Sequence, residues 1–255
     1  MDGNITSGDE PYVAAQRLAA AHRYTEAVDA YSGAINVDPN NIKARLGRGL
    51  ALQRIGDHTR ALSDFDCIIK QFGQWPGLYA VYYSRAVSRN ALGQSAGAIE
   101  DCNEALKTDP KNADALYLRG IARRDLGQTD AAMTDMDAVL AMDPNYDEAH
   151  SVRGQLNMLN RRWHRAIADL GFPIERGAWS TEDRRRCLYM RGIAAQELGD
   201  HCRAIADFTR AIELAPCDQG AYLRRARSYK AIGEPQLADT DLRIGTQTRP
   251  EAPKP

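Results

Sequence analysis

The chain has 255 residues, of which 44% are hydrophobic and 26% are charged, and its formal net charge is −1. This composition is typical of a globular protein, and the near-zero charge gives no support to nucleic acid or an anionic membrane as an obligatory partner. Because no run of about 18 apolar residues occurs and the first residues lack a secretory signal, we expect a cytoplasmic protein without a membrane span. Five cysteines without a CxxC pair are expected to be packing residues in a reducing compartment.

A short pattern recurs seven times along the chain. Alanines occupy one equivalent position, 34 to 38 residues apart: Ala27, Ala61, Ala98, Ala132, Ala166, Ala204 and Ala238. A second small residue precedes each alanine by twelve positions, and in five units a proline follows by twelve: Pro39, Pro110, Pro144, Pro216 and Pro250. Small residues at this spacing let two antiparallel helices approach closely, and proline starts the next unit because it does not fit a helix interior. The pattern predicts seven helical hairpins.

At this period the pattern resembles the tetratricopeptide repeat. The resemblance covers residues 8–252 and implies an all-α fold, a right-handed superhelical solenoid of antiparallel helix pairs. We place the repeats at 8–41, 42–78, 79–112, 113–146, 147–184, 185–218 and 219–252, between a flexible N-terminus at 1–7 and a tail at 253–255. Within the hairpins, glycine marks the turn at Gly56, Gly93, Gly127, Gly199 and Gly233, whereas repeats one and five carry His22 and Arg161.

Two joins between repeats are irregular. The second repeat is three residues longer than usual because of the segment 72–78 at its end, and the fifth is four residues longer because of the segment 171–184. Gly171 and Pro173 follow Ala166 closely, so we expect the second helix of repeat five to end early and this repeat to be the weakest part of the array. Trp75 and Trp179 lie in these inserts, where we expect them to fill gaps in the stack; a partner-binding loop is the alternative.

A charge series accompanies the small residues. An arginine stands before the first small residue in six units, and an aspartate follows it by sixteen positions in the same six: Arg48 and Asp64, Arg85 and Asp101, Arg119 and Asp135, Arg153 and Asp169, Arg191 and Asp207, Arg225 and Asp241. The first unit has alanine at both places. This co-occurrence predicts structural ion pairs between helices, with a ligand-binding row of arginines as the alternative.

The resemblance also implies where a partner binds, because the first helices of such repeats line a concave groove. Carried over to this chain, the groove positions include Tyr12, Leu46, Tyr83, Tyr117 and Tyr189, and the tyrosines among them are a residue type favoured at interfaces. Packing against the neighbouring hairpin is the alternative for each of these tyrosines. In the last repeat Arg224, Arg227 and Lys230 share one helix face, so we expect a partner that is acidic or ends in a carboxylate; a solvated helix face is the alternative.

Chemistry-bearing motifs are absent from the sequence. The histidines are scattered, and no phosphate-binding glycine loop or nucleophile elbow occurs, so we expect no enzyme, no metal and no cofactor. The favoured function is a scaffold or adaptor that binds a peptide or partner protein in the groove. A co-chaperone or secretion-type chaperone that holds client subunits is the alternative, and RNA binding is disfavoured by the net charge. The groove and the irregular segments 72–78 and 171–184 are both left open as the main interaction surface.

Overall fold

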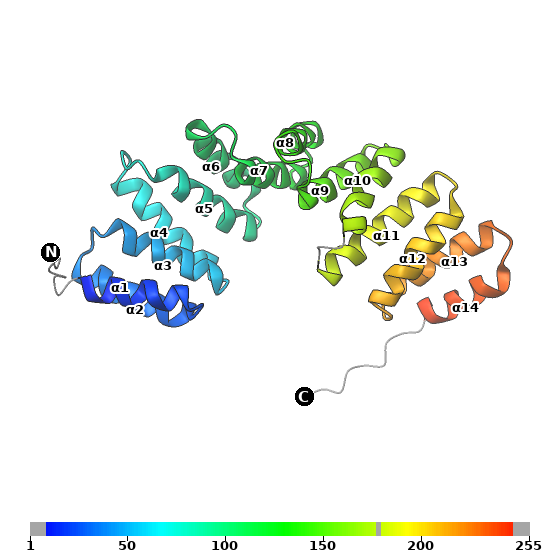
Figure 1. The fold of residues 1–255 in the computed structure, drawn as a ribbon, viewed down its shortest axis with the longest axis horizontal. Helices are drawn as coiled ribbons and strands as arrows, with labels where there is room; N and C mark the ends of the chain where they lie inside the picture. The colour runs from blue at the N-terminus through cyan, green and yellow to red at the C-terminus, as the bar shows by residue number, and fades with distance from the viewer. Residues whose placement is uncertain (1–8, 177–179, 247–255) are drawn as a thin grey trace, which may run out of the picture. The chain divides into compact units, whose positions relative to one another are not determined.

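The computed structural model describes residues 9–176 and 180–246, and within these ranges the elements are helices without a strand. The helices are α1 (Asp9–Ala20), α2 (Tyr24–Val37), α3 (Ile42–Arg54), α4 (His58–Gln71), α5 (Leu78–Ala91), α6 (Ser95–Thr108), α7 (Ala113–Asp125), α8 (Thr129–Met142), α9 (Asp147–Leu159), α10 (Trp163–Arg176), α11 (Thr181–Glu197), α12 (His201–Leu214), α13 (Gln219–Ala231) and α14 (Pro235–Thr246). Figure 1 shows them following one another as antiparallel pairs. This confirms the predicted all-α solenoid; the segments 1–7 and 253–255 lie outside the described residues.

The chain divides into two compact units, Met1–Asp135 and Met136–Pro255. In the first unit the odd-numbered helices contact one another in order, α1 with α3, α3 with α5 and α5 with α7. In the second unit α9, α11 and α13 do the same. Each of these helices also packs on at least one even-numbered neighbour. The odd-numbered helices therefore form the inner layer of each unit, which is the layer expected to line a groove.

The turn inside each hairpin has the backbone geometry that the sequence predicts. In the second repeat Gly56 has a φ of +81°, its N–H donates to Gln53 O, and Asp57 N–H donates to Leu52 O, which together close the helix end. His22 and Arg161 hold the same left-handed conformation, with φ of +59° and +53°. Side-chain oxygens then start the next helices: Asp57 accepts from Arg60 N–H at 3.1 Å, and Asn112 accepts from Ala115 N–H at 2.9 Å.

The small residues permit close helix packing, as the sequence predicts. A Cβ placed on Gly49 would lie 2.7 Å from the ring of Phe65, and one on Gly192 would lie 2.8 Å from the ring of Phe208. Both phenylalanines are fully buried between the two helices of their own hairpins. Any larger residue at either glycine would force the helices apart and open the core at its best-packed point.

The arginine and aspartate series forms ion pairs within single hairpins, which confirms the structural interpretation. Arg119 donates to Asp135 through Nε at 3.1 Å and through Nη2 at 2.7 Å. The other five pairs have the same two-pronged geometry: Arg48 with Asp64, Arg85 with Asp101, Arg153 with Asp169, Arg191 with Asp207 and Arg225 with Asp241. All six aspartates are buried. Hydrogen bonds to Asp64 raise the pKa of Arg48, so that guanidinium stays charged and paired.

The expectation of an early end to the second helix of repeat five is wrong, because α10 continues through Pro173 to Arg176. Proline removes one intrahelical hydrogen bond, but its neighbours hold the last turn in place. The ring of Phe172 stacks on His150 with centroids 4.0 Å apart, and Ile174 is buried against α11. Arg176 donates to Asn145 Oδ1 at 2.5 Å.

Most of the described residues of the segment 171–184 are helical. Residues 171–176 complete α10, and α11 begins at Thr181, four residues before the expected start of repeat six. Ser180 caps this added turn by accepting from Asp183 N–H at 3.1 Å. Trp179, which we expected to fill a gap here, lies outside the described residues. Trp75 in the other insert packs against the core cluster of the first unit, as expected of a gap-filling residue.

Candidate functional site

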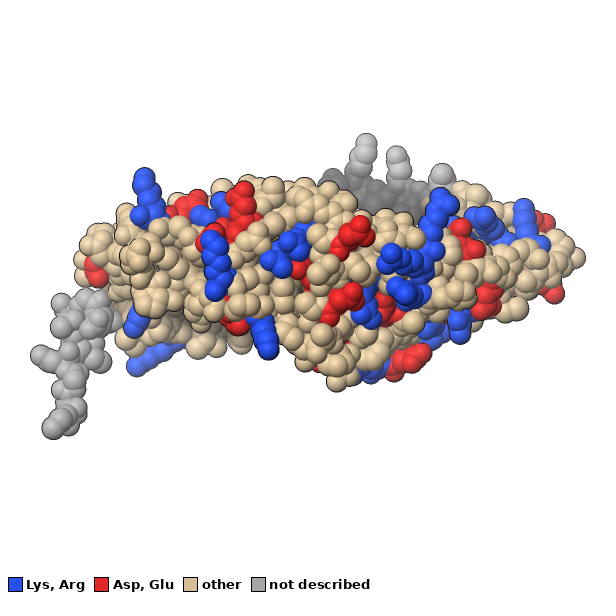
Figure 2. Space-filling view, turned by 90° about the horizontal axis from the view of Figure 1, so that it is seen from above, with Lys and Arg blue, Asp and Glu red and all other residues tan. Residues whose placement is uncertain are grey.

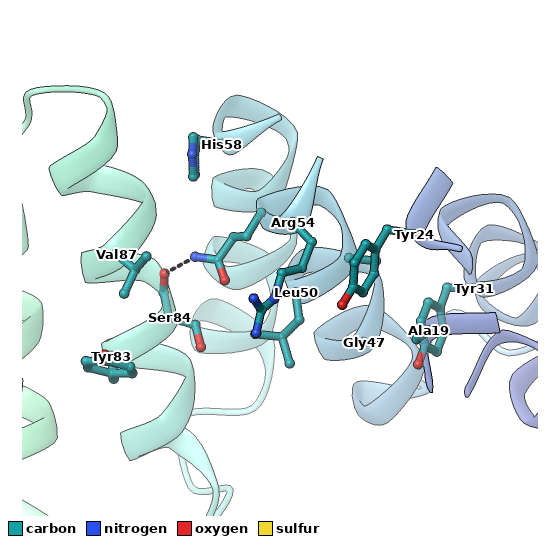
Figure 3. A pocket seen from close by; sticks show the side chains of 12 residues that line it. Ala19, Tyr24, Tyr31, Gly47, Leu50, Arg54, His58, Tyr83, Ser84 and Val87 are labelled. Atoms are coloured by element: carbon teal, nitrogen blue, oxygen red, sulfur yellow. Dashed lines mark hydrogen bonds between the residues drawn. The ribbon is translucent and has the colours of Figure 1, made fainter. Parts of the chain in front are cut away.

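A pocket of about 570 Å³ opens on the inner layer of the first unit. Figure 3 shows its lining, with Tyr24 and Tyr31 of α2 on one side, Tyr83 and Val87 of α5 on the other, and residues of α3 between them. Three successive hairpins therefore contribute to one concavity. Its volume is within the range of about 300 to 1,000 Å³ typical of ligand-binding pockets.

Tyr31 and Gly47 form the end of the pocket nearest α1. The ring of Tyr31 lies so close to α3 that a Cβ on Gly47 would come within 2.5 Å of it. Tyr31 is only 5% exposed, and Tyr12 lies against it with ring centroids 6.1 Å apart. Burial raises the pKa of Tyr31, so its hydroxyl is uncharged at neutral pH. The lack of a side chain at position 47 is thus what lets aromatic surface reach the pocket.

A glutamine fixes the spacing between α3 and α5. Nε2 of Gln53 donates to the carbonyl oxygen of Ser84 at 2.6 Å and to Oγ of Ser88 at 2.8 Å (Figure 3 draws the first of these bonds). The second unit repeats the arrangement, where Gln196 donates to Arg224 O at 2.7 Å and to Ser228 Oγ at 2.6 Å. Each bond joins neighbouring first helices, so the layer of odd-numbered helices is held by polar contacts as well as by packing.

The remaining lining combines exposed apolar surface with a cation. Leu50 is 42% exposed although it is a large apolar residue, and Val87 lies across from it on α5. Arg54 is exposed and forms no ion pair among the described residues. His58, the first residue of α4, also lines the pocket, and its buried Nδ1 has no hydrogen-bond partner among the described residues. Because His201 shows the same unpartnered Nδ1 at the start of α12, this feature belongs to the repeat rather than to the pocket.

One of the predicted groove residues lines this pocket, and the others lie elsewhere on the odd-numbered helices. Tyr83 lines the pocket, and burial raises its pKa. Tyr12 and Leu46 pack against the core cluster beside it. Tyr117 is half-buried on α7, and Tyr189 packs edge-on against Phe208 with centroids 5.8 Å apart. Both tyrosines are half-buried and pack against core clusters, and Tyr83 in addition lines the pocket, so their role in binding stays a prediction.

The basic residues predicted for the last repeat lie on α13. Arg227 and Lys230 are exposed and Arg224 is half-buried, and none of the three forms an ion pair within the part of the chain that the structure describes. Arg225, which lies between them, is occupied by its bond to Asp241. On the face shown in Figure 2, charges of both signs are interspersed among uncharged residues. A role for the α13 residues in binding stays a prediction.

Sequence reasoning missed Gln53 and the closely packed Gly47. The sequence does contain a signal for Gln53. Glutamine occupies the twelfth position of repeats two and six, and serine occupies the tenth position of repeats three and seven, which follow them. No comparable signal marks Gly47, since its role depends on the ring of Tyr31 in the preceding repeat.

Comparison with known proteins identifies the same repeats. Family models described as tetratricopeptide repeats match residues 15–56, 51–113, 90–156 and 186–216. The chain belongs to the tetratricopeptide repeat family. Serine/threonine-protein phosphatase 5 of Mus musculus is 31% identical over 121 residues, which are 45% of this chain and 22% of the phosphatase; the Homo sapiens protein matches over the same shares. The match thus spans about a fifth of these relatives' length.

Solved structures show the same fold at low sequence identity. A tetratricopeptide repeat protein from Parabacteroides merdae superposes with a TM-score of 0.69 at 18% identity, covering 94% of this chain and 92% of that one. MamA from Desulfovibrio magneticus superposes with a TM-score of 0.63 at 20% identity, covering 69% of this chain and 98% of that one. Membership of the family points to a protein-interaction scaffold of a kind that is generally non-catalytic.

Neither a metal-binding cluster nor a membrane-spanning helix is found among the described residues. Within residues 9–176 and 180–246, no group of three or more His, Cys, Asp or Glu side chains is placed to hold a metal ion. Among the described helices, none combines the length and the apolar character that a membrane crossing requires.

Proposed function

We propose that this tetratricopeptide repeat protein binds an extended segment of a partner protein along the inner layer of its first unit, with an apolar side chain of that segment in the pocket. The observation that supports this most is the meeting of Leu50, Tyr83 and Val87 around one concavity. Of these three, Tyr83 was expected on the groove from the sequence. An apolar anchor entering such a pocket typically contributes a large part of the binding free energy of an interface.

Arg54 indicates which charge the proposed partner segment carries. Its guanidinium lies at the pocket without an ion pair among the described residues, so a carboxylate on the partner next to the apolar anchor would gain a charge-assisted hydrogen bond there. The adjoining tyrosine rings supply rigid surface that loses little conformational entropy on binding. The proposed recognition element is thus an apolar residue flanked by an acidic one.

Selection from a library of random peptides on the full chain tests this proposal. We expect the selected peptides to share an apolar residue, and Leu50→Ala and Val87→Asp to weaken their binding about tenfold or more, as measured by fluorescence anisotropy. Leu92→Ala is the matched control, because Leu92 is 41% exposed, as Leu50 nearly is, and does not line the pocket. Circular dichroism should show unchanged helix content in all three variants.

Two outcomes would overturn the proposal. Equal binding to the Leu50→Ala and Leu92→Ala variants would place the interaction away from the pocket. Selection of many unrelated sequences without a shared apolar position would instead favour a chaperone that holds client subunits.

A further inference from the structure

The turn of the fifth hairpin, residues 160–165, combines three features that each lower its stability, of which the first hairpin shares the first two. Its backbone is the usual one, since Arg161 N–H donates to Met158 O at 3.0 Å and Arg162 N–H donates to Asn157 O at 2.8 Å. Five other hairpins place glycine at the left-handed position, whereas here Arg161 adopts a φ of +53°. Arginine carries a Cβ that this conformation disfavours, so the side chain is retained at a cost in backbone strain.

The next residue supplies no side-chain helix cap, as is also true of Arg23 in repeat one and Gln94 in repeat three. Repeats two and six read Gly-Asp-His at the turn, and there Asp57 and Asp200 accept hydrogen bonds from backbone N–H groups at 3.1 Å and 3.0 Å. Repeat five has Arg161, Arg162 and Trp163 at these three positions. Arg162 has no side-chain oxygen to accept such a bond, and its positive charge lies next to the positive end of the helix dipole of α10.

The same replacement leaves another cation without a partner. Arg60 and Arg203 form ion pairs with the capping aspartates Asp57 and Asp200, at 3.3 Å and 3.9 Å. Arg165 occupies the equivalent position of repeat five, but the residue that would pair with it is Arg162. Within the part of the chain that the structure describes, the side chains of Arg161, Arg162 and Arg165 form no ion pair and no hydrogen bond.

These cations surround apolar surface. A hollow of about 540 Å³ is lined by Arg161, Arg162, Trp163, His164, Arg165 and Leu198. Trp163 is half-buried at the start of α10, and Leu198, at the end of α11, is 36% exposed. Arginine and tryptophan are the residue types most enriched at the energetic centres of protein interfaces.

Strain, a missing cap and a missing counter-ion at one turn are typical of a site shaped for something other than stability. We infer that the Arg161–Arg165 turn is a docking surface for an acidic protein segment, whose carboxylates bind the three guanidiniums while an apolar side chain packs on Trp163 and Leu198. Charge complementarity favours carboxylates, because three unpaired guanidiniums would each gain charge-assisted hydrogen bonds. The apolar surface of Trp163 and Leu198 favours a protein segment, which can offer an aliphatic side chain, over a nucleic acid, which has none.

The test uses the full chain and a fluorescein-labelled peptide composed of Glu, Asp and Leu, with a twin in which Gln and Asn replace the acids. The acidic peptide should bind, and Arg162→Asp should weaken it about tenfold or more through the loss of charged hydrogen bonds. Arg210→Asp is the matched control, because it makes the same charge change at an exposed position of α12 outside the hollow. The affinity of the Arg210→Asp protein for the acidic peptide should be within about twofold of that of the parent protein, because a distant charge acts only through a long-range, screened effect.

A double variant separates binding from stability. Arg161→Gly with Arg162→Asp rebuilds the Gly-Asp turn of repeats two and six, so it should unfold at a higher temperature than the parent and yet lose the peptide. Retained binding by this variant, equal binding of the Gln and Asn twin, or tighter binding of a single-stranded oligouridylate than of the acidic peptide would each overturn the inference. An equal loss of affinity in the Arg210→Asp protein would do so as well.

Discussion

Arg191 lies directly against Gly171: a Cβ built on Gly171 would come 3.2 Å from Nη1 of Arg191. In five other repeats this guanidinium nitrogen donates to a side chain at the position that corresponds to Gly171, namely Ser32, Asp66, Asn103, Asp137 and Thr209. Each of those bonds ties a hairpin to the second helix of the hairpin before it. The join between α10 and α11 therefore lacks a contact that its counterparts have.

Restoring that contact should stabilise the protein. Gly171→Ser places a hydroxyl beside the flexible end of Arg191, and we expect it to raise the free energy of unfolding by about 1 to 2 kcal/mol through helix propensity and a charged hydrogen bond. Gly171→Ala is the control, since it gains only the helix-propensity share of about 0.5 to 1 kcal/mol. Urea unfolding of the three proteins measures the difference. A serine variant no more stable than the alanine variant would show that the hydroxyl makes no such bond.

The Arg–Asp pairs should differ in how much they stabilise the fold. Asp207 has Arg191 as its only ion-pair partner among the described residues, whereas Asp135 is bound by Arg119 and also by Arg123 at 2.8 Å. Removing Arg191 leaves a buried carboxylate uncompensated, so Arg191→Ala should cost about 3 to 5 kcal/mol. Arg119→Ala should cost less, because Arg123 still neutralises Asp135. Equal losses in urea unfolding would contradict this ranking.

The helices, their turns and the ion pairs could be predicted because each depends on residues close together in one repeat. Arg119 and Asp135 are sixteen positions apart in a single hairpin, and the same spacing recurs in every unit that has either residue. Arg161 could be placed in a turn without glycine for the same reason. Repetition within one chain supplied the evidence that a single copy would lack.

The continuation of α10 through Pro173 could not be predicted, because the contacts that hold its last turn come from other helices. His150 on α9 stacks on Phe172, and α11 buries Ile174. The pocket is similar in this respect, since it exists only where Tyr31 meets Gly47 of the next repeat. Periodicity identified which tyrosines belong to the inner layer, but packing between repeats determined which of them expose surface.

Burial should decide which cysteines react. The pKa of Cys102 is raised to about 12, chiefly because burial disfavours the thiolate, and burial raises the pKa of Cys187 as well. Cys202 and Cys217 are exposed. At pH 8 we therefore expect a thiol reagent to modify Cys202 and Cys217 in the native protein and Cys102 and Cys187 only after unfolding. Mass spectrometry of labelled peptides gives the order of modification, and early labelling of Cys102 would contradict it.

The raised pKa of Cys102 also predicts that the folded protein is less stable at alkaline pH. An unfolded cysteine titrates near pH 9, well below the folded value for Cys102. The folded state thus binds the proton more tightly, and this contribution to stability is complete below about pH 9 and is lost as the pH rises toward 12. Cys102→Ala should reduce the slope of unfolding free energy against pH in that range. An unchanged slope would assign the alkaline loss to other groups such as Tyr31 and Tyr83.

The basic residues of α13 provide the last prediction. Arg224, Arg227 and Lys230 are three apart on one helix and repel one another, and they have no ion-pair partner among the described residues. An acidic segment bound there would relieve this repulsion and gain charge-assisted hydrogen bonds. Replacing all three by alanine should lower the affinity for an acidic peptide with a free C-terminal carboxylate about tenfold. It should also flatten the dependence of this affinity on salt concentration. Lys43→Ala, Lys70→Ala and Lys111→Ala combined make the matched control, because they remove three exposed charges from the first unit without breaking an ion pair among the described residues. If the two triple variants bind this peptide equally well, with the same salt slope, the α13 residues form a solvated helix face and not a binding surface.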